Sequence, residues 1–234
     1  MSQAQLKPTA DQTFRIVATD DPQGLYDFQA IIAASRRMEH EGNVEGACNL
    51  RYQAFQRIYD LLPEGEETIL DWHDPATQAA VMLINYSAID HFLIGDWEMS
   101  AGMHELILEI DPEDHLEATT RLAYTYIALG ECDSLDEIIN DVSDKYADKQ
   151  VLLLWSEQRR SGRFPEGTLR RFKSHFAPYY REFTADEHPV TPEYLVDIDS
   201  ERPSPDALAR ELWLQTEHLW MLFPDFIAEL RKTI

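Results

Sequence analysis

The stretch "YIALGECDSLDEI", from Tyr126 to Ile138, holds an apolar helical run that stops at Gly130 and an acidic helical run that begins two or three residues later. A helix commonly ends with a residue in the left-handed conformation, where glycine avoids a side-chain clash. Asp133 then stands where the N-cap or the first turn of a second helix is expected. The stretch therefore predicts two helices joined by a tight turn.

The same pattern recurs along the chain. It surrounds Gly42 in "RRMEHEGNVEGACNL", Gly95 in "DHFLIGDWEMSAG" and Gly162 in "SEQRRSGRFPEGT". Gly95, Gly130 and Gly162 are 35 and 32 residues apart, and the longer interval from Gly42 to Gly95 contains the insert "LPEGEETILDWHDP". A period of about 34 residues, with one helical hairpin in each unit, is typical of tetratricopeptide repeats.

Further positions resemble the tetratricopeptide family. They are the repeat-ending proline, the small residues where helices cross, and the tyrosine before the turn: Pro112, Ala47, Ser100, Ala54 and Tyr126. Leu135 and Gly167 depart from the small-residue position, so the repeat is degenerate. The resemblance covers roughly residues 24–178 and implies an all-α fold, a right-handed superhelix of helical hairpins. "HPVTPEYL", before the last tryptophan-containing helix, is similar to the ends of bacterial tetratricopeptide-like proteins of uncharacterised function.

The expected organisation has three parts: an N-terminal extension at 1–23, helical repeats at 24–178, and a proline-rich connector with capping helices at 179–234. The expected helices span 24–41, 43–62, 75–94, 97–110, 114–129, 133–146, 148–161, 165–177 and 205–222, with a short one from Pro224. In the final part, the side chains of Trp213, Leu214, Leu219 and Trp220 are expected to cap the open end of the stack, because terminal repeats need a closing element.

The composition limits the partners. A net charge of −23 is repelled by nucleic acids and by anionic membranes, so neither is expected as a partner. The charge is explained either by solubility or by an acidic face for a basic partner. Neither a signal peptide nor a run of 18 apolar residues is visible, and Cys48 and Cys132 stand far apart in sequence. A cytoplasmic protein with buried free thiols is expected.

Residues that could carry chemistry are few. Acidic residues and a histidine gather in "DWHDP" (71–75) and "DPEDH" (111–115), and three acids alternate in "DIDSE" (197–201). The first two are interpreted as caps and solvated turns, since the ligand spacing of known zinc sites is missing. The third lacks the glycine and the distant glutamate of a calcium loop, so no metal site is expected there either. Cys132, near a helix start, is interpreted as a packed small residue. No catalytic residue, metal or cofactor is expected.

A basic segment runs from Arg159 to Arg181, with seven Lys or Arg and one acid, Glu166. One interpretation is that these cations cover the acidic helix expected at 133–146. The other is a docking patch for an acidic partner, because arginine forks bind carboxylates well. The residues assigned to this patch are Arg160, Arg163, Arg170, Arg171 and Lys173.

The predicted function is a non-enzymatic protein-interaction module, whose partner is a protein or peptide that binds in the concave groove or on the basic patch. Under the glycine register, the first helix of each hairpin lines the groove. The groove residues are then Arg36, Asn85, Ile89, Phe92, Thr120, Tyr124, Ile127 and Arg159. Two alternatives stay open: an enzyme that uses His91 or His115 beside an acid in a helical cleft, and a structural protein that self-associates into homo-oligomers.

Overall fold

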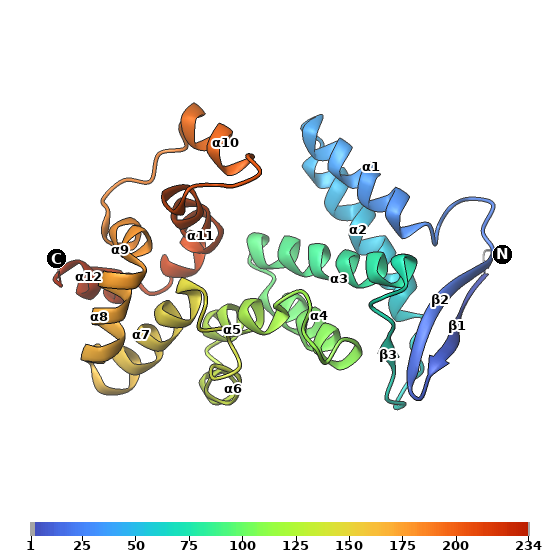
Figure 1. Ribbon diagram of the computed structural model, residues 1–234, viewed down its shortest axis with the longest axis horizontal. Helices are drawn as coiled ribbons and strands as arrows, with labels where there is room; N and C mark the ends of the chain where they lie inside the picture. Colours follow the sequence, from blue (N-terminus) through green and yellow to red (C-terminus); the bar gives the residue numbers. More distant parts are fainter. Residues whose placement is uncertain (1–2, 234) are drawn as a thin grey trace. The chain divides into compact units, whose positions relative to one another are not determined.

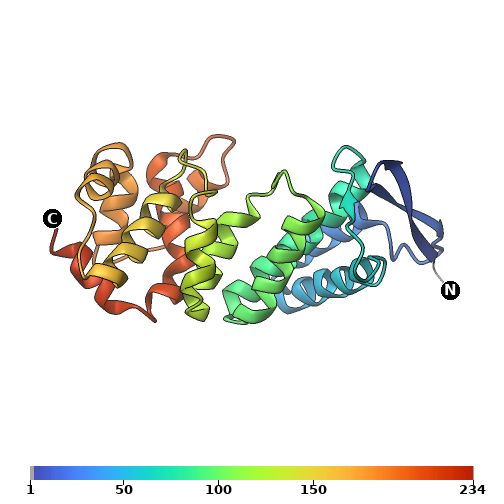
Figure 2. The ribbon, with the colours of Figure 1, turned by 90° about the horizontal axis from the view of Figure 1, so that it is seen from below.

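The computed structural model describes residues 3–233. These residues form twelve helices and three short strands, so the expected helical class is confirmed and a small sheet is added to it (Figures 1 and 2). The chain divides into two compact units. The N-terminal unit ends at Leu122 and the C-terminal unit begins at Ala123. The division therefore falls inside a helix, whereas the sequence suggested a boundary at 178.

The N-terminal extension forms a β-hairpin, which the sequence analysis did not predict. Strand β1 (Gln3–Ala10) pairs antiparallel with β2 (Thr13–Asp20), and the start of β2 pairs in parallel with β3 (Ile69–Leu70). The stretch "TFRIVATD" is rich in β-branched residues, which favour strands. Ile16 is buried, and its amide donates a hydrogen bond to Oγ1 of Thr77, which ties the hairpin to the helices.

Four helices build the rest of the N-terminal unit, and each packs on the next in sequence: α1 (Phe28–His40), α2 (Val44–Tyr59), α3 (Pro75–Ile94) and α4 (Trp97–Ile110). Helix α3 is apolar on most sides and provides much of the core, with Ala80, Val81, Leu83, Ile84 and Ala88 almost fully buried. Helix α5 (Ala118–Leu129) crosses the division between the units.

The four repeat glycines end helices as predicted, because each has a positive φ between 68° and 81°. At Gly130 the amide of the following residue, Glu131, donates to the carbonyl of Tyr126 at 3.0 Å. At Gly95 the amide of Asp96 donates to the carbonyl of His91 at 2.9 Å. Such bonds across the turn satisfy carbonyls that the helix end would leave open.

The C-terminal unit contains shorter helices. They are α6 (Cys132–Ile138), α7 (Ala147–Ser161), α8 (Glu166–His175), α9 (Ala177–Thr184), α10 (Pro192–Ile198), α11 (Pro205–Trp220) and α12 (Pro224–Arg231). The helix expected at 133–146 ends early, because Asn140, Asp141, Ser143 and Asp144 favour turns over helix. Helix α9 runs across the boundary expected at 178, and the connector beyond it also contains α10.

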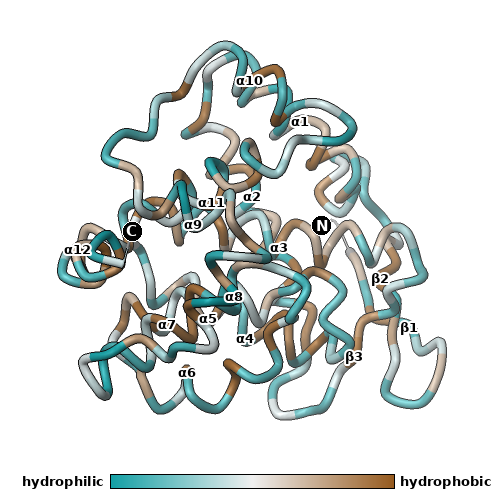
Figure 3. Tube along the Cα trace, turned by 60° about the vertical axis from the view of Figure 1, so that its left-hand side comes forward, coloured by the Kyte–Doolittle hydropathy of each residue, from teal (hydrophilic) through white to brown (hydrophobic). Residues whose placement is uncertain are grey.

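An aromatic cluster forms the core of the C-terminal unit. Trp220 lies against Tyr124, Phe183 and Phe226, with ring centroids 6.1, 5.9 and 5.2 Å away. Trp213 packs edge-on against Phe183 at 5.2 Å. Apolar and polar stretches alternate along the helices of both units (Figure 3). Helices α11 and α12 thus supply buried aromatic side chains, Trp213, Trp220 and Phe226, to the core of their unit. In the described part of the chain, none of the helices combines the length and the hydropathy needed to cross a membrane.

Candidate functional site

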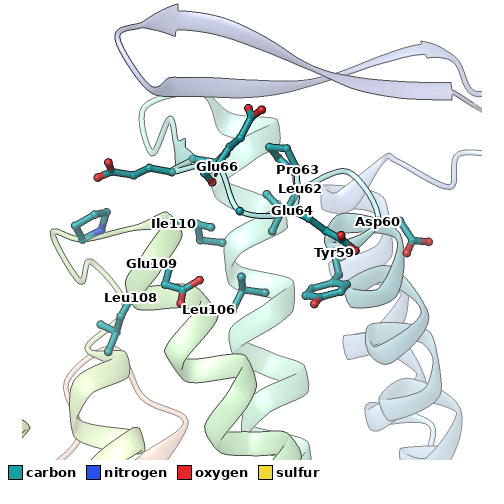
Figure 4. A pocket seen from close by; sticks show the side chains of 14 residues that line it. Tyr59, Asp60, Leu62, Pro63, Glu64, Glu66, Leu106, Leu108, Glu109 and Ile110 are labelled. Atoms are coloured by element: carbon teal, nitrogen blue, oxygen red, sulfur yellow. Dashed lines mark hydrogen bonds between the residues drawn. The ribbon is translucent and has the colours of Figure 1, made fainter.

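A cleft of about 980 Å³ lies in the N-terminal unit, where the loop 60–68 approaches the end of α4 (Figure 4). Its size is typical of sites that bind a ligand or a short peptide. The lining residues come from the end of α2, the loop, the end of α4 and the turn after it: Tyr59, Asp60, Leu62, Pro63, Glu64, Gly65, Glu66, Glu67, Thr68, Leu106, Leu108, Glu109, Ile110 and Pro112.

Local sequence explains why two helices stop beside this cleft. Helix α2 ends at Tyr59, four residues before Pro63, which cannot continue a helix. Helix α4 ends at Ile110, two residues before Pro112. Gly65, with φ of +74°, then turns the loop back towards β3, whose Ile69 amide donates to the carbonyl of Gln12 at 2.9 Å. The sheet thereby anchors the far end of the loop.

The floor of the cleft is apolar. Leu62, Leu106 and Leu108 are half-buried and pack on the core of the unit, and Ile110 is buried beside them. Tyr59 keeps 58% of its surface exposed, which is much for an aromatic side chain at the edge of a core. Figure 4 shows these side chains on the helix side of the loop. The floor therefore offers apolar contact area to an occupant.

The charged residues of the lining are all acids. They are Asp60, Glu64, Glu66, Glu67 and Glu109, and all five are exposed. Within residues 3–233, none of the five carboxylates forms an ion pair or accepts a side-chain hydrogen bond. The negative ends of two helix dipoles add to this charge, because α2 and α4 both terminate here. Helix α4 also lacks a basic residue in its last turn.

The predicted groove residues of the N-terminal unit lie elsewhere. Arg36 and Ile89 line a second cavity of about 250 Å³ between α1, α2 and α3. Arg36 is exposed, and its Nη2 donates to the hydroxyl of Tyr86 at 2.9 Å. The floor of this cavity is an ion cluster in which Arg51 binds both Asp90 and Glu39. Burial of Cys48, beside this cluster, and the nearby charge of Asp90 raise the pKa of its thiol.

Other predicted groove residues lie inside the molecule. Phe92, Tyr124 and Ile127 are almost fully buried, so in this structure they belong to the core and their surfaces do not reach a partner. Asn85 and Thr120 are half-buried. Arg159, on α7, is exposed, and its guanidinium lies 5.6 Å from the ring centre of Trp155. Of the predicted groove residues, Arg36 and Ile89 thus line the same cavity, and the predicted groove residues are divided between the two units.

The basic segment is only partly available to a partner. Arg160 binds Asp136 of α6, and Arg171 binds Asp144 with 3.7 Å between Nη1 and Oδ1. Lys173 bonds the carbonyl of Thr233 and lies over the ring of Tyr180. By contrast, Arg163 and Arg170 are exposed, and their side chains have no ion pair or hydrogen bond within residues 3–233.

A third cavity, of about 300 Å³, lies in the C-terminal unit beside α10 and α11. Arg210, the one cation among its lining residues, is already bound to Glu182. Hydrogen bonds from Ser204 to Asp197 lower the pKa of that carboxyl. Arg210 and Asp197 are therefore already bound within the protein.

Two histidines do lie beside acids, as the enzyme alternative requires. Nδ1 of His91 is 3.0 Å from Asp96, and Nδ1 of His115 is 2.7 Å from Asp111. Neither histidine lines any of the three cavities. His115 instead stacks on Trp72 with centroids 4.6 Å apart.

The acid-rich stretches serve as turns and caps. Asp74 caps α3 by accepting from the Thr77 amide, Asp111 accepts from the His115 amide, and Asp197 accepts from the Ser204 amide. Across residues 3–233, no three His, Cys, Asp or Glu side chains come together as a metal site would require. Cys48 and Cys132 are free thiols, both half-buried.

The cleft residues were missed by sequence reasoning, although one signal was present. The insert "LPEGEETILDWHDP" interrupts the repeat spacing and concentrates proline, glycine and acids. Loops that interrupt a repeat often carry a binding function.

Compared with known proteins, the chain matches no family model, no curated protein and no solved structure.

Proposed function

We propose that this chain is a non-enzymatic protein-interaction module, a right-handed superhelix of tetratricopeptide-like hairpins, and that it binds a segment of a partner protein in the cleft of the N-terminal unit. The repeat is supported by the sequential packing of α1, α2, α3 and α4 and by the glycines that end helices at 42, 95, 130 and 162. Solenoids of this kind use loops and concave faces for binding.

One observation carries the proposal: a cleft of about 980 Å³ with an apolar floor and an unpaired polar rim. Such a surface offers contact area and orientation to a polypeptide. The cleft lining contains no histidine, cysteine or serine, and its five carboxylates are exposed and accept no side-chain hydrogen bond within residues 3–233, so no paired nucleophile and base is present there. Binding therefore explains the lining better than catalysis does.

The experiment is an unbiased selection. A random peptide display library is panned on the protein, and binders are then tested against Leu108→Trp, which fills part of the cleft floor without a change of charge. Leu208→Trp is the control, since Leu208 is an exposed leucine of α11 in the other unit. Binders that Leu108→Trp weakens and Leu208→Trp leaves unchanged would support the proposal. Binders indifferent to Leu108→Trp, or a selection that yields none, would refute it.

A further inference from the structure

We infer that the occupant of the cleft is a basic amphipathic peptide, in which Lys or Arg residues flank a large apolar side chain. The inference rests on the proposed function and specifies its ligand. It depends on three features of the cleft that reinforce one another: the apolar floor, the carboxylates left without partners, and the two helix ends.

The floor requires an apolar group. Leu62, Leu106 and Leu108 present half-buried surface at one place, and Tyr59 leaves 58% of its surface open beside them. Covering such surface is favourable, because apolar area is removed from water. An inorganic cation or a fully polar chain gains nothing from this surface, so the occupant carries at least one large apolar side chain.

The rim requires positive charge. Glu64, Glu66 and Glu67 follow one another along the loop, and Glu109 faces the cleft from α4. Some acids elsewhere in the protein are paired, such as Asp136 with Arg160 and Asp144 with Arg171. The cleft acids have no such partner within residues 3–233, and their mutual repulsion is relieved when a cation binds.

The C-terminal ends of α2 and α4 also favour a positively charged occupant. The last carbonyls of α2 and α4 are directed towards the C-terminal ends at Tyr59 and Ile110, both of which line the cleft. Helix C-termini favour cations, and acids placed there are unfavourable. Helix α2 carries Arg57 in its last turn, whereas α4 has no basic residue there and is followed by Asp111. A Lys or Arg of the partner would supply the positive charge that the C-terminus of α4 lacks.

The first arm of the test compares probes by fluorescence anisotropy at low salt. The probes are a short lysine–leucine peptide, its glutamate–leucine analogue, a lysine–serine peptide and spermine. The inference predicts that the lysine–leucine peptide binds at least about tenfold more tightly than each of the others, and that added salt weakens it through screening. Equal binding of the glutamate analogue, the lysine–serine peptide or spermine would overturn it.

The second arm locates the charge. The variant Glu64→Gln/Glu66→Gln/Glu67→Gln/Glu109→Gln removes four exposed carboxylates that have no partner within residues 3–233. The control Glu131→Gln/Asp133→Asn/Glu137→Gln/Asp141→Asn removes the same charge from exposed positions in and around α6. Since an exposed ion pair contributes roughly a factor of two to binding, the cleft variant is expected to lose about tenfold in affinity and the control little. Equal losses would show attraction to net charge alone and would overturn the inference.

The two proposals fail in different ways. If the display selection returns cleft binders that are neutral or acidic, the binding module stands and the basic ligand is refuted. If no peptide of any composition responds to Leu108→Trp, the binding module itself is refuted. Circular dichroism melting of each variant shows whether a loss of affinity comes from the cleft or from unfolding.

Discussion

Arg51 on α2 holds Asp90 on α3 with a two-pronged ion pair, Nε to Oδ2 at 2.7 Å and Nη2 to Oδ1 at 2.8 Å. The Arg51 side chain is 6% exposed and that of Asp90 14% exposed. Replacing Arg51 by Met leaves a nearly buried carboxylate uncompensated, so we expect a loss of about 3–5 kcal/mol in the free energy of unfolding. Urea titration measures it.

The matched control is the double variant Arg51→Met/Asp90→Leu, which removes both charges. We expect it to recover most of the lost stability, because an apolar pair can replace a buried ion pair at little cost. If the single and the double variant are equally unstable, the ion pair is not the cause.

His104 makes the stability of the protein depend on pH. Burial and the charge of Arg121 lower its pKa to about 3, although the hydrogen bond between Nδ1 and the Ser100 carbonyl acts in the opposite direction. The unfolded pKa is about 6.5, so His104 is neutral when folded and gains a proton on unfolding in acid. Its contribution is complete above pH of about 6.5 and declines by up to about 1.4 kcal/mol per pH unit towards pH 3.

The variant His104→Met removes this proton uptake while it keeps an apolar side chain of similar length. Unfolding free energies are measured from about pH 7 down to about pH 4 for both proteins. We expect the wild-type curve to fall more steeply than the variant curve. Parallel curves would show that His104 titrates normally in the folded state.

Gly130 is required by its backbone conformation and not by lack of space. Its φ is +73°, and an added Cβ meets no atom within 4 Å. Gly130→Val is expected to cost more than about 1 kcal/mol, because β-branched residues are poorly tolerated at positive φ. Gly102→Ala is the control, since Gly102 lies within α4 with open space around it and alanine is expected to stabilise there by about 0.5–1 kcal/mol. Coincident thermal melts of the Gly130→Val variant and the wild type would disprove the requirement for glycine at position 130.

The basic segment allows two variants to be compared that change the net charge by the same amount. Arg160→Glu/Arg171→Glu breaks the pairs with Asp136 and Asp144, whereas Arg163→Glu/Arg170→Glu changes the charge equally at residues without such pairs in the described structure. We expect the first variant to be less stable by about 1 kcal/mol or more and the second to stay within about 0.5 kcal/mol. If both melt alike, the two pairs do not stabilise the acidic segment around α6.

The helices of the N-terminal unit could be predicted well from sequence where caps and breakers agree. Helices α3 and α4 begin and end at the expected residues, 75–94 and 97–110, because Pro75 and Gly95 mark their limits. The hairpin escaped notice because its turn lacks an Asn-Gly signal and places Gln12 at a φ of +53°. Its first strand also contains Pro8, which is typical of an edge strand.

The cleft could not be predicted in the same way. Its loop, 60–68, and the end of α4 are some forty residues apart in sequence and meet only through the packing of α2, α3 and α4. The groove set was derived from helix register, which does not say how deep a side chain lies. Phe92, Tyr124 and Ile127 have the right register and are nevertheless buried.

The most direct test of the proposed binding role is an amide NMR titration of the labelled protein with the lysine–leucine peptide. The account predicts saturable shift changes concentrated at residues 59–68 and 106–112, and the Glu-to-Gln cleft variant is expected to need about tenfold more peptide to reach saturation. Changes that instead concentrate at Arg36 and Ile89, or at Arg163 and Arg170, with the cleft resonances unmoved, would contradict it.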